Sequence, residues 1–206
     1  MALKSRRAVF LDKDGTLIED VPYNVDPARI RLAACAPQGL RRLHEAGYLI
    51  VVVSNQSGVA RGLFPERGLR GVEARLRELL AEHDVPLAGF YYCPHHPEGV
   101  VAQYAVECDC RKPAPGMILR AARDLHLDLA RSWFIGDILN DVEAGRRAGC
   151  RTILLDNGNE TEWELSRERL PDCVVSDIRD AAGVILSSRA APNRPNDDEL
   201  PEFSQK

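Results

Sequence analysis

The stretch Val9-Phe10-Leu11-Asp12-Lys13-Asp14-Gly15-Thr16 decides how the chain is read. Apolar residues typical of a strand run into two carboxylates one residue apart, and a glycine then turns the chain. Because residues i and i+2 of a strand share a face, the loop can bring Asp12 and Asp14 into one small volume, where Mg²⁺ would relieve their repulsion. An ordinary solvated turn is the alternative, since Asp-Gly is a common turn dipeptide.

Strand and helix patterns alternate along the rest of the chain. The run at 48–54 is mostly apolar and rich in β-branched residues, which is typical of a strand buried on both faces of a parallel sheet. Strands are predicted at residues 8–12, 48–54, 88–92, 132–136, 151–155 and 173–175, and helices at 38–46, 66–83, 115–126, 140–148 and 178–188. This alternation predicts an α/β fold, a doubly wound parallel sheet of the Rossmann-like type.

Composition limits the class of protein. The 206 residues, 45% hydrophobic and 28% charged, predict a single globular domain over residues 1–188, followed by a polar, proline-rich tail at 189–206 that we expect to be disordered. A net charge of −4 argues against a nucleic-acid partner, and no apolar run is long enough for a membrane span. We expect a cytoplasmic monomer that acts on a small molecule.

Polar side chains follow several of the predicted strands. Asp12 follows the first, Ser54 ends the second, Asp137 follows the fourth, and Lys112 precedes the helix that leads to the fourth. Ligands bind at the carboxyl ends of the strands in such sheets, so these groups should converge. Carboxylates, Mg²⁺, a lysine and a hydroxyl together suit phosphoryl transfer, with an aspartate as the nucleophile. Taken singly, Asp137 is also explained as a helix N-terminal acid and Lys112 as a surface lysine.

The loop at 93–112 contains the pattern C-x-H, twelve residues, then C-x-C. Its four candidate ligands are Cys93, His95, Cys108 and Cys110, a set that matches a closed, structural Cys₃His zinc site. His96 is an alternative ligand, and scattered buried cysteines are the alternative explanation for the whole pattern. The remaining cysteines, Cys35, Cys150 and Cys173, are interpreted as core residues.

The four polar segments resemble the motifs of the haloacid dehalogenase (HAD)-like phosphatase superfamily. Asp12-Lys-Asp14-Gly-Thr16 is similar to its first motif, Ser54 to the second, Lys112 to the third, and Gly136-Asp137-x-x-x-Asp141 to the fourth. The resemblance implies that Asp12 is the nucleophile and Asp14 the general acid/base. It also implies Mg²⁺ on Asp12, Asp137 and the Asp14 carbonyl, with Asp141 supporting the loop.

Within this superfamily, Cys-Pro-His-His-Pro, Cys-x-Cys-Arg-Lys-Pro and Ser-Asn-Gln-Ser-Gly-Val-Ala-Arg-Gly resemble the D-glycero-D-manno-heptose 1,7-bisphosphate 7-phosphatases. The resemblance implies a zinc-stapled loop, no large cap domain and a phosphorylated sugar as substrate. The substrate contacts that it implies are Asp20, Tyr23, Ser54, Asn55, Gln56, Ser57, Arg111 and Lys112. Arg111 could hold a second, distal phosphate through paired hydrogen bonds.

The sequence departs from this pattern at Ile138, where the heptose phosphatases usually carry a lysine, and residues 157–170 match no family feature. The related histidinol-phosphate phosphatases share the zinc loop and are the rival of the same class. A receiver module, whose acceptor aspartate follows the third strand, and a catalytically idle phosphate-binding module are rivals from another class. The receiver is disfavoured because Cys93 ends the third strand here.

Overall fold

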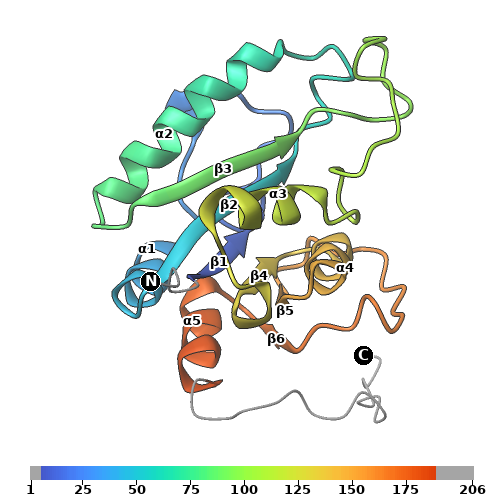
Figure 1. Ribbon diagram of the computed structural model, residues 1–206. Coiled ribbons are helices and arrows are strands. Elements are labelled where there is room, and N and C mark those ends of the chain that lie inside the picture. The colour runs from blue at the N-terminus through green and yellow to red at the C-terminus, as the bar shows by residue number, and fades with distance from the viewer. Residues whose placement is uncertain (1–5, 189–206) are drawn as a thin grey trace.

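A six-stranded sheet, with every neighbouring pair of strands parallel, forms the centre of the computed structural model, which describes residues 6–188 (Figure 1). In the spatial order β3-β2-β1-β4-β5-β6 the strands are β1 (Arg7–Leu11), β2 (Tyr48–Asn55), β3 (Leu87–Cys93), β4 (Trp133–Gly136), β5 (Arg151–Leu155) and β6 (Cys173–Val175). The predicted α/β fold with a parallel sheet is confirmed. The predicted tail at 189–206 lies outside the described residues.

Helices cover both faces of the sheet because alternate residues of each strand point to opposite sides. In β1, Val9 and Leu11 join one core and Phe10 joins the other. The first core is closed by α1 (Ala36–Glu45), α2 (Leu69–Ala81) and α5 (Ile178–Ser187), and the second by α3 (Gly116–Leu125) and α4 (Leu139–Ala148) (Figure 1). The strand β2 contributes to both cores, as its β-branched run predicted.

The helical pattern at 66–83 forms two elements rather than one. A 3₁₀ turn, η2 (Glu66–Gly68), follows the extended Pro65, and the α-helix begins only at Leu69. Two further 3₁₀ turns were not predicted, η1 (Pro27–Arg29) and η3 (Leu129–Arg131). In η1 the Asp26 side chain accepts a hydrogen bond from the Ala28 N–H, which caps a segment too short to show periodicity.

The direction of winding reverses at β1, because β2 and β3 lie on one side of it and β4, β5 and β6 on the other. The crevice between β1 and β4 is therefore the topological switch point, where α/β sheets bind ligands. The segment between β1 and α1 contains only η1 and isolated bridges, and no large cap is inserted in the described chain.

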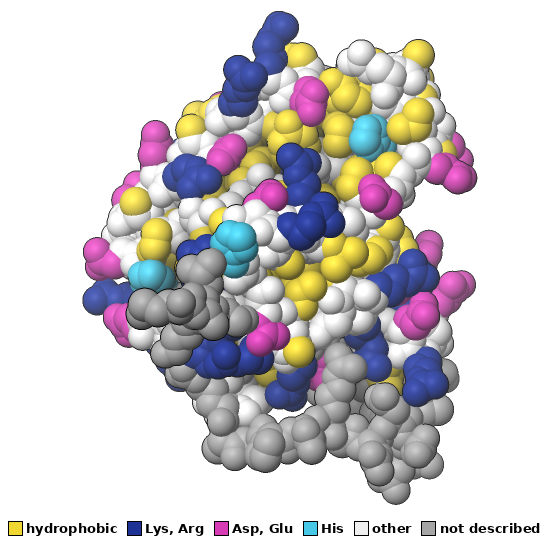
Figure 2. Space-filling view, in the orientation of Figure 1, with side chains coloured by type: hydrophobic (Ala, Val, Ile, Leu, Met, Phe, Trp, Pro, Cys, Tyr) yellow, Lys and Arg dark blue, Asp and Glu magenta, His cyan; other side chains and the backbone are white. Residues whose placement is uncertain are grey.

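The surface carries both signs of charge on the face seen in Figure 2, where basic and acidic side chains are intermixed. The same view shows a hollow in the surface. In Figure 1, which has the same orientation, this hollow lies between the loop after β3 and the segment after β5. Among residues 6–188 there is no helix with the length and apolar character needed to cross a lipid bilayer.

Candidate active site

The carboxyl ends of β1 and β4 meet at the switch point, and an aspartate follows each of them. Asp12 comes directly after β1 and Asp137 directly after β4. The backbone N–H of Asp12 donates to the Ile135 carbonyl of the neighbouring strand at 3.0 Å, which fixes one strand end against the other. The sheet thus places both carboxylates at the edge that the sequence predicted.

Three buried carboxylates gather at this point. One oxygen each from Asp12, Asp137 and Asp141 lie within 4.8 Å of one another. The Asp14 side chain lies outside this cluster, and its carboxylate accepts hydrogen bonds from Lys13 Nζ at 2.5 Å and Gln56 Nε2 at 3.2 Å. A metal contact through the Asp14 carbonyl stays a prediction.

Lys112 enters the carboxylate cluster from the loop before α3. Its Nζ lies 2.5 Å from Asp12 Oδ1 and 2.6 Å from Asp141 Oδ1, and the residue is only 3% exposed. Burial alone would lower the pKa of Lys112, but the charges of Asp12 and Asp141 outweigh burial and raise it. A permanently charged ammonium therefore lies beside the expected nucleophile.

Asn55 and Asp141 hold Lys112 in position. Asn55, at the end of β2, accepts a hydrogen bond from the Lys112 backbone N–H at 3.0 Å and donates one to the Lys112 carbonyl at 3.1 Å. Asp141 also accepts from the Ile138 N–H at 3.3 Å, so it joins the start of α4 to the lysine. The side-chain amide of Asn55 holds the backbone of Lys112, and its predicted contact with the substrate stays a prediction.

The two strand-end carboxylates are strongly desolvated. Burial raises the pKa of Asp12 to about 7, against the lowering effect of Lys112, and burial likewise raises the pKa of Asp137 to about 6. Buried carboxylates that resist ionisation are stabilised by a bound cation, and oxygen donors of this kind fit Mg²⁺. The donor set therefore fits the predicted magnesium site.

The pH dependence of magnesium binding follows from these shifts. A carboxyl group with a raised pKa in the folded state stabilises the metal-free protein at low pH, and this contribution is lost as the pH rises through the folded value. A divalent cation needs the ionised carboxylates, so its affinity must rise over the same interval, about pH 6–7 for Asp12 and Asp137.

We expect Mg²⁺ to raise Tm only weakly near pH 5 and clearly near pH 8. Equal ionic strength in NaCl is the control, and a rise that does not depend on pH would contradict the assignment.

Ser54, the residue of the second motif, is linked to the loop after β1 by hydrogen bonds through Gln56. Gln56 Nε2 donates to Ser54 Oγ at 2.7 Å and to Asp14 Oδ2 at 3.2 Å. Both Ser54 and Gln56 are buried, at 1% and 6% exposure. The end of β2 is therefore joined to the loop after β1, as the common edge of a parallel sheet requires.

The other predicted substrate residues lie toward the surface. Tyr23 is 52% exposed with a positive φ of 54°, Asp20 is exposed, and Ser57 is half-buried in the turn after β2. None of these belongs to the carboxylate cluster, so their contact with a substrate stays a prediction. Asp20 and Tyr23 lie on the segment between β1 and η1.

Two contacts to Asp137 were not foreseen from the sequence. Thr16 Oγ1 donates to Asp137 Oδ1 at 2.9 Å, and Asn159 Nδ2 donates to Asp137 Oδ2 at 2.7 Å. Thr16 belongs to the opening motif, which offered a signal. Asn159 lies 22 residues beyond Asp137, in the segment that matched no family feature, and no local pattern pointed to it.

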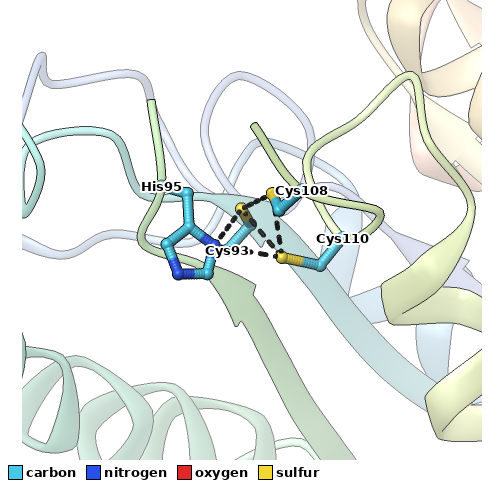
Figure 3. A group of neighbouring side chains, drawn as sticks. All are labelled: Cys93, His95, Cys108 and Cys110. Atoms are coloured by element: carbon cyan, nitrogen blue, oxygen red, sulfur yellow. Dashed lines mark hydrogen bonds between the residues drawn. The ribbon is translucent and has the colours of Figure 1, made fainter. Parts of the chain in front are cut away.

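A second group of metal-type ligands lies at the end of β3 and in the loop that follows it. Figure 3 shows Cys93, His95, Cys108 and Cys110 pointing toward one another. The Cys93 sulfur lies 3.1 Å from that of Cys110 and 3.5 Å from that of Cys108, and the Nδ1 of His95 is 3.4 Å from the Cys110 sulfur. Ligands of a tetrahedral zinc ion with Zn–S bonds near 2.3 Å lie about 3.8 Å apart, so these four residues could hold a metal of that kind.

Two thiols of this group, Cys110 and Cys93, have pKa values shifted in opposite directions. The hydrogen bonds between Cys110 and the other two thiols, Cys93 and Cys108, lower the pKa of Cys110 to about 5, whereas the hydrogen bond with Cys110 and burial raise the pKa of Cys93. Thiolates bind metal ions, and a metal replaces the protons of the thiols that ligate it, so this group of thiols suits metal binding. Cys150 is buried as predicted, Cys173 is partly buried and packs against the core, and Cys35 is partly exposed.

A basic group lies beside the Cys/His cluster. Arg61 Nη2 lies 3.1 Å from His96 Nε2, and Arg111 Nη1 approaches the His95 carbonyl at 3.4 Å. Desolvation, together with the charges of Arg111 and Arg61, lowers the pKa of His96. Two guanidinium groups and a neutral imidazole therefore lie near one another, and one of the three residues, Arg111, directly precedes Lys112.

A scan against known families matches residues 109–181 to the family described as HAD-hyrolase-like. Among curated relatives, the D-glycero-beta-D-manno-heptose-1,7-bisphosphate 7-phosphatase of Salmonella typhi is 39% identical over 183 residues, covering 88% of this chain and 96% of the relative. The protein of the same name from Escherichia coli strain K12 is 40% identical, covering 86% and 92%.

Solved structures show the same likeness. A HAD-like phosphatase from Mesorhizobium loti is 35% identical with a TM-score of 0.78, covering 93% of this chain and 90% of that one. The D,D-heptose 1,7-bisphosphate phosphatase of B. bronchiseptica, solved with magnesium and phosphate, is 32% identical with a TM-score of 0.75, covering 88% and 99%.

Proposed function

The chain belongs to the HAD-like phosphatase family, and we propose that it removes the 7-phosphate from D-glycero-D-manno-heptose 1,7-bisphosphate by a Mg²⁺-dependent reaction at Asp12. The observation that carries the proposal is the meeting of Asp12, Asp137 and Lys112 at the switch point of the sheet. Relatives that the chain matches over most of its length bear the name of this activity.

The first half of the reaction uses Asp12 as the nucleophile. A carboxylate oxygen of Asp12 forms a bond to phosphorus while the bond between phosphorus and the C7 oxygen of the sugar breaks, leaving an aspartyl-phosphate. The Asp14 carboxyl gives its proton to the departing sugar oxygen. Lys112, fixed by Asp141 and Asn55, places its positive charge beside the phosphoryl oxygens.

The second half returns the enzyme to its starting state. Asp14, now ionised, takes a proton from a water molecule, whose oxygen bonds to phosphorus as the bond to Asp12 breaks. Inorganic phosphate leaves and both carboxylates recover their original protonation. Mg²⁺ bound to Asp12, Asp137 and the Asp14 carbonyl would offset the negative charge that gathers at the phosphoryl group.

We propose zinc as the metal of the Cys93, His95, Cys108 and Cys110 cluster. The ligand set and its spacing support this identity, and four protein ligands leave no position for water, so the ion would be structural. It would fix a long loop whose last ligand, Cys110, lies two residues before Lys112. We also propose that the enzyme works as a cytoplasmic monomer; its six unpaired thiols suit a reducing compartment.

The basic group formed by Arg61, His96 and Arg111 supports a bisphosphate as the substrate. A guanidinium group binds a phosphate through two parallel hydrogen bonds, and Arg111 adjoins the lysine that faces the reacting phosphate. The lysine that the heptose phosphatases usually carry is replaced by Ile138, so the positive charge for the distal phosphate would come from this side of the site.

A phosphate-release assay across substrates tests the proposal. We expect kcat/KM for heptose 1,7-bisphosphate to exceed that for histidinol phosphate by at least about 100-fold, because an unfilled charged subsite costs several kcal/mol. Both anomers of the bisphosphate are compared in the same assay. Faster hydrolysis of histidinol phosphate would contradict the substrate assignment, and no release from any ester would contradict the phosphatase assignment.

Arg111→Met sharpens this test because it removes only the guanidinium. KM for the bisphosphate should rise about tenfold or more, while hydrolysis of an aryl monophosphate is unchanged. Arg120→Met, on the exposed side of α3, is the matched control. Equal loss on both substrates would show that Arg111 supports the fold of the loop instead.

A further inference from the structure

The segment that follows β5 approaches the active site, although its sequence gave no sign of a role there. Asn159, in this segment, places its side-chain amide against the Asp137 carboxylate, with Nδ2 at 2.7 Å from Oδ2. Gly15, with φ of +76°, lies under both groups, and a Cβ atom there would collide with the Asn159 amide and the Asp137 carboxylate. Only a glycine at this turn allows the two side chains to meet as they do.

The Asp137 carboxylate is held by donors from two separate segments. Thr16 donates to Oδ1 at 2.9 Å, and Asn159 donates to Oδ2 at 2.7 Å. Hydrogen bonds to both oxygens fix the plane of the carboxylate, and each oxygen keeps a lone pair for a further partner. This is the arrangement by which outer groups orient a metal ligand.

Neighbouring residues of the segment fix the position of Asn159. Asn157 Nδ2 donates to the Gly15 carbonyl at 2.7 Å, on the loop after β1. Glu160 Oε2 accepts from the Leu139 N–H at 2.6 Å, at the first turn of α4. The amide of Asn159 is thus located by contacts to both loops that form the carboxylate cluster.

Apolar packing does not explain these contacts. Residues 156–159 and 161–168 are exposed, and none of them belongs to a buried core cluster. The segment is held at this end by polar contacts to the site. A role in orienting the site accounts for them where a role in the core does not.

We propose that Asn159 is a positioning residue that holds the Asp137 carboxylate in the orientation that binds the divalent cation. The inference rests on the proposed function, since it assigns Asp137 to Mg²⁺. Asn159 does not touch the reacting atoms; it acts through Asp137.

Two variants separate the hydrogen bond from the space that the side chain fills. Asn159→Ala removes both, and Asn159→Leu keeps a similar volume without the donor. Thr161→Ala, two residues along the same exposed segment, is the matched control. The first readout is the rise in Tm with Mg²⁺ alone, without substrate, and the second is the Mg²⁺ concentration that gives half-maximal phosphate release.

Both Asn159 variants should need about tenfold more Mg²⁺ in both readouts, as typical for loss of a group that orients a metal ligand. Their kcat at saturating Mg²⁺ and their metal-free Tm should stay close to those of Thr161→Ala. Wild-type Mg²⁺ dependence in both variants, or in Asn159→Leu alone, would overturn the inference and leave the proposed function intact. A wild-type protein that neither binds nor needs Mg²⁺ would overturn both.

Discussion

Replacing Asp12 with asparagine should reduce kcat by at least about 10³-fold, the largest effect on activity that the structure predicts. The amide cannot attack phosphorus, although it fills the same space. Lys112 keeps its second partner, Asp141, at 2.6 Å, so the buried ammonium is not left alone. The variant should therefore fold, and the loss should appear in kcat for every phosphate ester. Phosphate release under saturating Mg²⁺ is the measurement.

Asp84→Asn is the matched control for this substitution, because it makes the same chemical change on an exposed carboxylate far from the sheet edge. Both variants should keep the wild-type circular dichroism spectrum. Asp12→Asn is also expected to lose the pH-dependent part of magnesium binding that the raised pKa of Asp12 causes. Turnover near the wild-type rate in folded Asp12→Asn would exclude this residue as the nucleophile.

Cys110→Ser should have the largest effect on stability. Cys110 has the most central sulfur of the Cys/His cluster, with contacts to Cys93, Cys108 and His95 at 3.1, 3.3 and 3.4 Å. Without its thiolate the zinc should be lost, and the free energy of unfolding should fall by more than about 3 kcal/mol, since a structural metal stabilises the loop that it fixes. Metal analysis and denaturant unfolding measure the two effects.

Cys173→Ser controls for the removal of a thiol, because Cys173 lies in β6 and outside the cluster. The wild-type protein, purified without chelator, should hold about one zinc per chain. Activity should fall with the metal, because Lys112 follows Cys110 by two residues and depends on the position of the loop. A wild-type protein without zinc, or a Cys110→Ser variant of unchanged stability, would contradict the assignment.

Much of the fold could be predicted because its signals are local. The β-branched run at β2 is buried on both faces, and the aspartates after β1 and β4 meet because parallel strands end at a common edge. Each predicted strand matches an observed strand to within one residue at either end. The Cys/His cluster also follows from spacing alone, since two tight pairs on one loop need only one turn to meet.

The remaining features depend on contacts between distant segments. The Asn159 amide contacts Asp137, and the Asn55 amide contacts the backbone of Lys112. Nothing in the sequence near either asparagine shows these contacts, because they form only when separate loops meet at the sheet edge. The 3₁₀ turns were missed because three residues show no period. The substrate contacts at Asp20 and Tyr23 came from resemblance, and the structure leaves both side chains exposed.

Capture of the phosphoenzyme tests the central claim most directly. The enzyme is mixed with Mg²⁺ and heptose 1,7-bisphosphate, quenched in acid within the first turnover, digested and examined by mass spectrometry. One phosphoryl group should appear on the peptide that contains Asp12, should be released by hydroxylamine as an acyl phosphate, and should be absent from Asp12→Asn. A first turnover that releases phosphate without labelling this peptide, or a label that persists in Asp12→Asn, would contradict the account.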